Sequence, residues 1–519
     1  MSAKKETFYI TTTLPYVNAD PHIGFAAEIV RADIIARYQR MIGKEVFFNT
    51  GTDEHGLKIY RQAQEAGKDV QKYVDEYAAK FQLLDDALNL SFNSFIRTTD
   101  PKHIKAAQEF WRLCKENGDI YKKNYQVKYC VGCEMEKSDS ELENGRCSIH
   151  PNQELELIDE ENYFFAWSKY QQKLLDFYEK NQNFVIPQHR LHEIKNFVSA
   201  GLQDFSISRL KDKMPWGVPV PDDEEHVMYV WFDALVNYIS CLGWPKDNKT
   251  FEKFWPGIQV AGKDNLRQQT AMWQAMLMSA GLPNSKQVLI FGFINSGGQK
   301  MSKSLGNVIN PMEVVHKYGT DTVRYFIASG LPTFEDSDFT YERFEKKYNS
   351  DLANDLGNLL SRTLSMTEKY FYGKVPKFNV SASGGDSDKF FEFDLKTDWE
   401  RYDHYMTSFQ FDQALAVAWE NIRKSNAYIE KERPWELVEM DKDILADVMY
   451  NLLETLRQTA IMIRPFMPAA SEKILKQLGF SPAKEFKKSI LDLRKWATLP
   501  LGQKIKKDKP LFPRLNNKQ

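Results

Sequence analysis

Short apolar runs alternate with segments of helical spacing over the first fifty residues. Residues 8–13 are β-branched and aromatic and predict a buried strand, and residues 45–51 predict a second one. Between them, after a loop rich in turn residues, Ile29, Ile34 and Tyr38 recur near helical spacing. Strand, loop, helix and strand in this order are typical of a parallel nucleotide-binding sheet.

The same pattern returns later in the chain. Apolar, sheet-like segments occupy residues 226–236, 258–265 and 287–295, and a helical stretch lies near 270–278. Residues 118–225 interrupt the pattern with short mixed elements. We therefore expect one α/β domain that is split by an insertion.

From about residue 346 onward the chain predicts helices. The segments 348–371, 408–431 and 446–467 carry apolar residues at helical spacing, and 379–389 is expected to be a flexible loop. An all-α helical bundle is the fold expected here. The predicted domains are the first half of a Rossmann-type domain (1–117), the insertion (118–225), the second half (226–345) and the helical domain with its tail (346–519).

Composition fits this size and class. The chain has 519 residues, 42% hydrophobic and 27% charged, as expected for a globular protein of roughly three domains. Its first residues carry no apolar run long enough for a signal peptide, and no apolar run of about 18 residues occurs, so we expect a cytoplasmic protein that does not bind membranes. The net charge is -2, so a nucleic-acid partner would need a local basic patch. Residues 484–519, with eleven Lys and Arg against three Asp and Glu, are equally compatible with such a patch and with a solvated, partly frayed tail.

Four possible metal ligands lie close together in the insertion. Cys130 and Cys133 form one pair, and Cys147 and His150 form a second. Three thiolates and one imidazole at this spacing are typical of tetrahedral Zn²⁺, and with no open position for substrate they predict one structural zinc ion per chain. The remaining cysteines, Cys114 and Cys241, are expected in the core.

Two motifs suit phosphate chemistry. Residues 21–24 (PHIG) stand at a predicted helix start, where free N–H groups and the helix dipole favour phosphate and where His22 can donate a hydrogen bond. Residues 300–304 (KMSKS) follow an apolar strand and a Gly-rich loop, so Lys300 and Lys303 can approach and neutralise a phosphate leaving group.

With these motifs the chain resembles the class I aminoacyl-tRNA synthetases, whose HIGH and KMSKS motifs match residues 22–25 and 300–304. The strings TLPYVNADPHIG, GTDEHG, YVWFDAL, GKD and KMSKSLGN are similar to those of the methionine-specific members, in the same order over residues 8–310. The helical remainder also fits that family. The resemblance implies a two-step ligase that uses ATP with Mg²⁺ to activate L-methionine and then loads tRNA(Met), including the initiator tRNA.

The resemblance also implies a set of site residues. The catalytic residues are His22, Lys300 and Lys303. The ATP-binding positions are His22, Gly24, Phe25, Glu28, Gly262, Asp264, Lys300 and Lys303. The methionine-binding positions are Thr13, Leu14, Tyr16, Asp53, Val230, Trp231, Ala234, Leu235, Tyr238, Asn265 and Gln269. The anticodon-binding positions are Asn358, Arg362 and Trp435, which in the family hydrogen-bond to and stack on the CAU bases.

Two departures from the family pattern fall within these sets. The second histidine of HIGH is Phe25, which cannot hydrogen-bond to ATP. After GKD, Asn265 and Gln269 stand where the family often has isoleucine and histidine.

Three alternatives remain open at this point. A synthetase for isoleucine, valine or leucine is disfavoured by the short insertion, and a nucleotidyltransferase with a HIGH-type fold is disfavoured by the helical domain. A tRNA-binding protein without catalysis is suggested only by Phe25. No further dimerisation domain is evident, so a monomer is expected.

Overall fold

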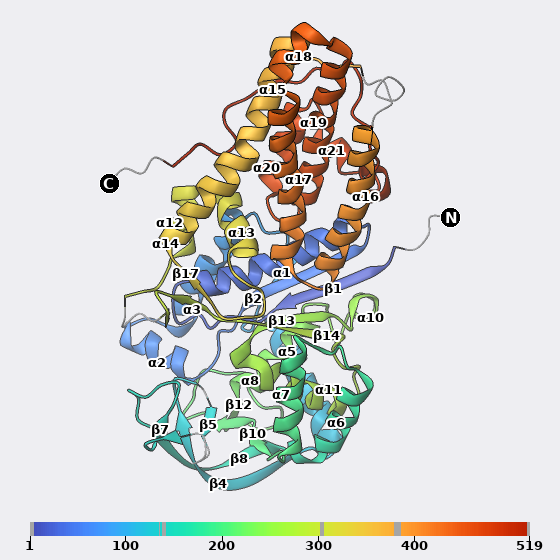
Figure 1. Ribbon diagram of the computed structural model, residues 1–519. Helices are drawn as coiled ribbons and strands as arrows, with labels where there is room; N and C mark the ends of the chain where they lie inside the picture. Colours follow the sequence, from blue (N-terminus) through green and yellow to red (C-terminus); the bar gives the residue numbers. More distant parts are fainter. Residues whose placement is uncertain (1–4, 134, 138–141, 302–305, 378–385, 516–519) are drawn as a thin grey trace.

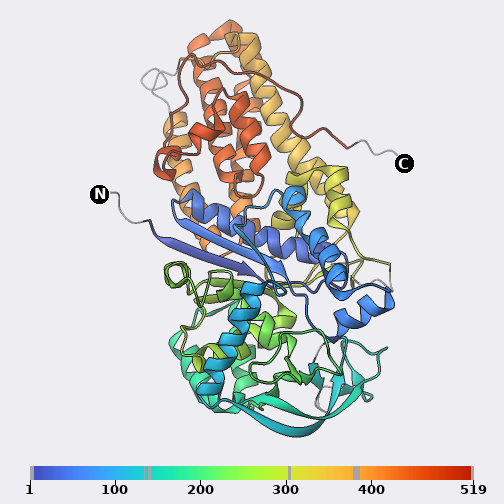
Figure 2. The same ribbon diagram turned by 180° about the vertical axis from the view of Figure 1, so that it is seen from behind.

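The computed structural model describes residues 5–133, 135–137, 142–301, 306–377 and 386–515 (Figure 1). A parallel sheet lies at the centre, with a helical domain on one side of it and a mixed region on the other (Figures 1 and 2). The fold is thus a Rossmann-type α/β domain followed by an α-helical domain, as the sequence predicts.

The central sheet has six parallel strands in the order β3-β2-β1-β13-β14-β9. Their bounds are β1 Thr7–Thr12, β2 Glu45–Thr52, β3 Ser94–Arg97, β9 Val185–Ile186, β13 Ile258–Gly262 and β14 Gln287–Phe291. Strand β9 belongs to the segment expected to be an insertion, and it pairs with β14 at the edge of the main sheet.

Both faces of this sheet are buried. Successive side chains of a strand point to opposite faces, so each strand contributes to two cores. Phe8 and Ile10 of β1 join a core with α1 (Ile23–Met41) and the helical domain, whereas Tyr9 joins a second core with α5 (Pro101–Glu116) and α11 (Trp273–Ser279). The remaining helices of the first half are α2 Leu57–Glu65, α3 Val70–Gln82 and α4 Leu84–Leu88.

The region after α5 is built on a long antiparallel pair. Strands β4 (Ile120–Cys130) and β8 (Glu156–Phe165) pair along their length, in a sheet of order β10-β8-β4-β5. The other elements are β5 Met135–Lys137, β6 Leu142–Glu143, β7 Arg146–Cys147, η2 Trp167–Tyr170, α6 Gln171–Lys180, α7 Gln188–Ser199, β10 Phe205–Ser206 and β11 Ser208–Leu210.

The structure corrects one element prediction. Residues 226–236 are sheet-like in sequence, yet only β12 (His226–Met228) is a strand, and it pairs with β11 rather than with the central sheet. Helix α8 (Val230–Ala234) follows immediately. A short apolar run does not distinguish strand from buried helix, so tertiary packing decides between them.

The second half of the α/β domain ends with short elements around the 300–304 motif. Strand β15 lies between β16 and β17 in a separate sheet. The bounds are α9 Asn237–Ser240, α10 Asn248–Phe254, η3 Lys263–Asn265, a π-helix η4 Gln268–Met272, β15 Ile294–Ser296, β16 Gln299–Lys300, α12 Pro311–Tyr318, α13 Thr320–Ser329 and β17 Ser337–Phe339.

The helical domain follows the predicted segments. Its long helices are η6 Tyr348–Gly357 (a π-helix) continued by α15 Asn358–Phe371, then α16 Asp386–Thr407, α17 Phe411–Glu432 and α19 Lys442–Ile463. Shorter ones are α14 Tyr341–Lys347, α18 Pro434–Met440, α20 Pro468–Gln477, α21 Pro482–Glu485 and α22 Ile490–Leu493. The loop predicted at 379–389 lies outside the described residues up to 385, and its last residues begin α16.

The C-terminal segment is ordered against the helices as far as residue 515. Arg457 donates to the carbonyl oxygens of Leu493 and Lys495, and Tyr348 donates to that of Pro513 at 2.8 Å. Fraying is therefore wrong for residues 484–515, although most of them are exposed to solvent as expected. Among the described residues, no helix is long and apolar enough to span a bilayer.

Candidate functional site

One cavity of about 490 Å³ opens where the central strands end. Its walls include Thr13, Asp53, Gly262 and Phe291, which follow or close β1, β2, β13 and β14 at their carboxyl ends. This edge of a parallel sheet is where ligands bind in α/β folds.

The cavity brings together nearly all of the predicted ATP and methionine positions. The predicted residues in its wall are Thr13, Leu14, Tyr16, His22, Gly24, Phe25, Glu28, Asp53, Trp231, Ala234, Leu235, Tyr238, Gly262, Asp264, Asn265, Gln269 and Lys300. Val230 is not among them, because it is 1% exposed and packs with Tyr129 and Tyr229 behind the wall. Lys303 lies outside the described residues.

His22 caps the start of α1. Its Nδ1 atom accepts hydrogen bonds from the N–H groups of Gly24 (3.1 Å) and Phe25 (3.4 Å). The N–H of Ile23 donates to the Ile309 carbonyl and that of Ala26 to the His22 carbonyl. The N–H groups that we expected to be free for phosphate are therefore already bonded, and the expectation is wrong because the motif caps its own helix.

This cap also fixes the protonation of the imidazole. Since Nδ1 accepts, a neutral His22 carries its proton on Nε2, where it can donate to a ligand. His22 is exposed, yet desolvation of its ring by the surrounding chain and the charge of Lys300 both lower its pKa, which favours this neutral form.

Phe25 makes an aromatic contact in place of a polar one. Its ring packs edge-on against Phe81 of α3, with centroids 5.3 Å apart and planes at 83°. It is partly buried against the core below α1 and lines the cavity. The substitution therefore adds an apolar wall without filling the cavity.

Glu28 lies one turn further along α1 and holds the end of β1. Its Oε1 atom accepts from the Thr13 N–H at 3.1 Å and from the Thr13 hydroxyl at 2.5 Å. Burial raises the pKa of Glu28 to about 7, with a contribution from the charge of Asp264. Asp264 is exposed, yet desolvation by the surrounding chain raises the pKa of its carboxyl, whereas the charge of Lys300 lowers it.

Lys300, the first residue of the KMSKS motif, lines the same cavity as Glu28 and Asp264. Lys300 ends β16, which pairs with β15, and its ammonium lies 5.1 Å from the centre of the Phe293 ring. Lys263 approaches the same ring at 4.6 Å. Cationic and acidic groups thus meet at one end of the cavity.

Asp53 and the aromatic residues form the other end. Asp53 is 3% exposed, and its backbone N–H donates to the Pro15 carbonyl while its carbonyl accepts from the Val17 N–H. The Gln269 amide donates to the Tyr238 hydroxyl at 2.6 Å and accepts from Gln259 at 3.0 Å. The Gln269 side chain is thus held by hydrogen bonds to both Tyr238 and Gln259.

Several residues that line the cavity were not predicted. They include Asn18, Arg31, Lys58, Asn237, Gln268 and Phe293. Asn237 lies two residues after the string YVWFDAL and Lys58 two residues after GTDEHG, so their position beside a motif was an available signal.

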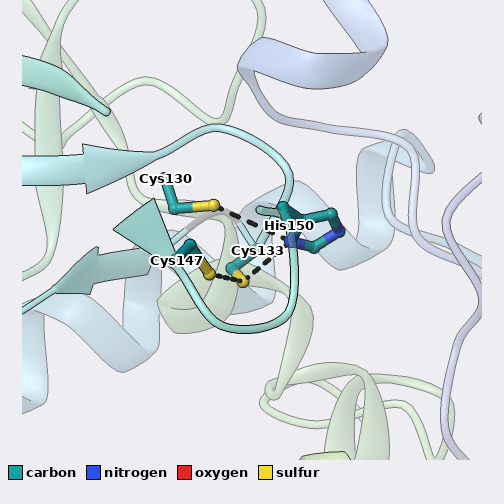
Figure 3. Close-up of side chains that lie close together, drawn as sticks. All are labelled: Cys130, Cys133, Cys147 and His150. Carbon is teal, nitrogen blue, oxygen red and sulfur yellow. Dashed lines mark hydrogen bonds between the residues drawn. The ribbon is translucent and has the colours of Figure 1, made fainter. Parts of the chain in front are cut away.

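The four predicted metal ligands converge in the insertion (Figure 3). One ligand atom from each of Cys130, Cys133, Cys147 and His150 lies within 4.8 Å of all the others. The Cys133 sulfur lies 3.5 Å from that of Cys147 and 3.2 Å from His150 Nδ1. Tetrahedral Zn²⁺ with Zn–S bonds of about 2.3 Å requires sulfur atoms about 3.8 Å apart, so the donor set fits a metal ion.

The predicted anticodon residues do not line the cavity and belong to the helical domain, on α15 and α18 (Figure 1). Asn358 is exposed on α15, and Arg362, one turn on, forms an ion pair with Glu430 at 2.7 Å. Trp435 begins α18 and remains 42% exposed. An exposed indole beside polar groups is a surface that can stack on bases.

Comparisons with known proteins agree with this architecture. The family described as tRNA synthetases class I (M) matches residues 8–147 and 132–364, and the anticodon-binding domain of methionyl tRNA ligase matches 379–519. The methionine–tRNA ligases of Thermotoga maritima and Thermosynechococcus vestitus are each 43% identical. Both alignments cover 98% of this chain, with 81% and 97% of the respective relatives.

Solved structures agree as well. Methionyl-tRNA synthetase of Mycobacterium tuberculosis in complex with methionyl-adenylate matches with a TM-score of 0.93 and 36% identity, over 98% of this chain and 100% of that one. The free form of the same enzyme matches with a TM-score of 0.86. From the parallel sheet, the cavity at its carboxyl edge and these full-length matches, the chain belongs to the methionyl-tRNA synthetase family, the class I methionine–tRNA ligases.

Proposed function

We propose that the cavity binds Mg²⁺-ATP and L-methionine together and forms methionyl-adenylate. The observation that carries this proposal is that one cavity joins the His22, Glu28, Asp264 and Lys300 cluster to a pocket of Asp53 and aromatic side chains. The methionine carboxylate attacks the α-phosphate of ATP, and pyrophosphate leaves.

Positioning and charge stabilisation carry this step. The attacking carboxylate is already ionised, so no general base is needed. The Nε2–H of His22 donates to a phosphate oxygen, and Lys300 and Lys303 neutralise the charge that develops on the departing pyrophosphate. Asp264 accepts from the ribose hydroxyls, and Gly24, Phe25, Glu28 and Gly262 shape the rest of the nucleotide site.

The amino-acid pocket discriminates by charge and shape. The Asp53 carboxylate pairs with the substrate ammonium. Trp231 and Tyr238 surround the thioether, which packs favourably on aromatic rings, and Gln269 orients the Tyr238 hydroxyl. Thr13, Leu14, Tyr16, Ala234, Leu235 and Asn265 complete the wall, and Val230 supports Trp231 from behind.

The metal ion proposed for the Cys130 cluster is structural zinc. All four donors come from the protein, so no coordination position remains for substrate. Cys133 and His150 also line the cavity, so the metal would hold the short β5–β7 region as one wall of the site.

In the second step the 2′-hydroxyl of the terminal tRNA ribose attacks the carbonyl carbon of the adenylate and loses its proton. Methionyl-tRNA forms, and AMP leaves. Asn358, Arg362 and Trp435 read the anticodon of tRNA(Met), including the initiator.

The cytoplasm is the proposed location, and a monomer is the proposed oligomeric state. The proposed bounds at residues 117 and 225 delimit the insertion within the catalytic domain, and the bound at 345 separates the catalytic from the RNA-binding part.

Amino-acid-dependent ATP–pyrophosphate exchange with all twenty amino acids tests the proposal. We expect exchange with methionine alone. Exchange with a different amino acid would retain adenylation and overturn the methionine specificity. No exchange from folded, zinc-loaded protein that binds tRNA would favour the non-catalytic alternative and implicate Phe25.

A further inference from the structure

Two buried residues directly follow Asp53 and take no part in the cavity wall. Glu54 is fully buried and His55 is 4% exposed. They belong to the string GTDEHG, of which the proposed function uses only Asp53. Burial of a carboxylate and an imidazole costs free energy unless both find partners, so their partners show what the segment is fixed to.

His55 is joined to a second histidine through one carboxylate. Asp233 Oδ2 lies 2.6 Å from His55 Nδ1, and Asp233 Oδ1 lies 2.8 Å from His103 Nε2. The other nitrogen of His103 lies 2.9 Å from the Ser240 hydroxyl. Neither imidazole is more than 5% exposed at its side chain, and Asp233 is 1% exposed.

The chemistry of these groups orders the hydrogen bonds. An ionised carboxylate only accepts, so both imidazoles donate to Asp233, from Nδ1 of His55 and from Nε2 of His103. Burial opposes ionisation, yet the two imidazoles lower the pKa of Asp233 to about 2, so the carboxylate is charged. A neutral His103 then accepts from Ser240.

Glu54 also holds the segment that follows Asp53, through partners different from those of His55. Its carboxylate accepts from Arg97 at 2.6 and 2.9 Å and from the hydroxyls of Thr52 and Thr99. Its carbonyl accepts from the Trp216 indole at 2.6 Å. The main chain that carries Asp53 is therefore held immediately after this residue.

Asp233 stands on the element that supplies the aromatic wall. Helix α8 has only five residues and no side-chain cap, so it cannot fix its own orientation. Trp231, Ala234 and Leu235, on either side of Asp233, line the cavity. The His55–Asp233–His103 chain thus joins the Asp53 loop, α8 and α5.

We propose that Asp233, held by His55 and His103, is a positioning residue for methionine binding. It fixes the Asp53 carboxylate and the Trp231 wall relative to each other without touching the substrate. This inference rests on the proposed roles of Asp53 and Trp231 in the pocket. It assigns a role to His55, Asp233 and His103, none of which lines the cavity.

Steady-state ATP–pyrophosphate exchange gives the test, with separate KM values for methionine and ATP. His55→Leu removes one donor to Asp233, and we expect the KM for methionine to rise about tenfold while that for ATP stays within about twofold. His55→Asn places an amide nitrogen where Nδ1 lies and should restore most of the methionine KM. Asp233→Asn retains the volume but offers only one acceptor, so it should raise the methionine KM as well.

Arg457→Met is the matched control for stability loss. Arg457 forms a buried ion pair with Glu454 in α19, remote from the cavity, so its loss should lower Tm and leave both KM values unchanged. An unchanged methionine KM in Asp233→Asn, or equal increases for methionine and ATP, would overturn the inference. If His55→Leu does not fold, Asp233→Asn decides alone. Wild-type protein that shows no methionine-dependent exchange would instead refute the proposed function.

Discussion

Arg324 connects the catalytic sheet to the helical domain, and its removal is expected to cost much stability. The side chain is fully buried, and its guanidinium forms an ion pair with Asp33 of α1 at 2.7 Å. It also donates to the carbonyl oxygens of Leu88, Pro465 and Phe466 at 2.8–3.0 Å. One side chain thus joins α1, the end of α4 and the link between α19 and α20.

The magnitude follows from what Arg324→Met leaves behind. Three buried carbonyl oxygens lose a donor, and Asp33 keeps Arg37 and Ser91 as partners. Removing one partner of a buried ion pair typically costs about 3–5 kcal/mol. Because Asp33 remains partly paired, we expect the free energy of unfolding to fall by about 3 kcal/mol, the lower end of that range.

Urea-induced unfolding, followed by circular dichroism, measures this loss. Arg433→Met is the matched control, because Arg433 pairs with Glu436 on the surface of the helical domain and both side chains are more than a third exposed. A pair of this kind contributes about 1 kcal/mol or less. Equal losses for the two variants would show that Arg324 does not hold the domains together.

Three further predictions concern the candidate sites. Because the pKa of Glu28 is about 7 in the folded chain and 4.5 ordinarily, the folded state binds this proton more tightly. The free energy of unfolding should therefore fall from about pH 4.5 to 7 by on the order of 3 kcal/mol, and urea titrations of Glu28→Gln should lack that component; an identical pH profile would contradict it. Cys133→Ala should lose bound zinc in elemental analysis while Cys241→Ala, outside the cluster, retains it; zinc retained in both would place the metal elsewhere. Trp435→Ala should raise the KM for tRNA about tenfold through lost stacking and leave pyrophosphate exchange unchanged, whereas Met440→Ala on the same helix should change neither; equal effects of the two would refute base stacking.

The sequence by itself determined the order and class of the main elements. The continuous aromatic and β-branched run of β1 and the helical spacing in α1, α17 and α19 arise from local packing demands, so the chain pattern records them. The metal cluster was also readable, because its ligands lie within 21 residues of one another. The strings around Thr13, Asp53 and Trp231 placed most of the cavity wall.

Only the tertiary structure decided which polar groups meet. His22 caps α1 only in one orientation of its side chain. Gln269 meets Tyr238 across 31 residues of sequence. Asp233 meets His55 and His103 across 178 and 130 residues, and Arg324 reaches Phe466 across 142. A local pattern reports which face of an element is buried, but the partner of a buried charge is fixed only when distant segments pack, because burial then makes an unpaired group costly.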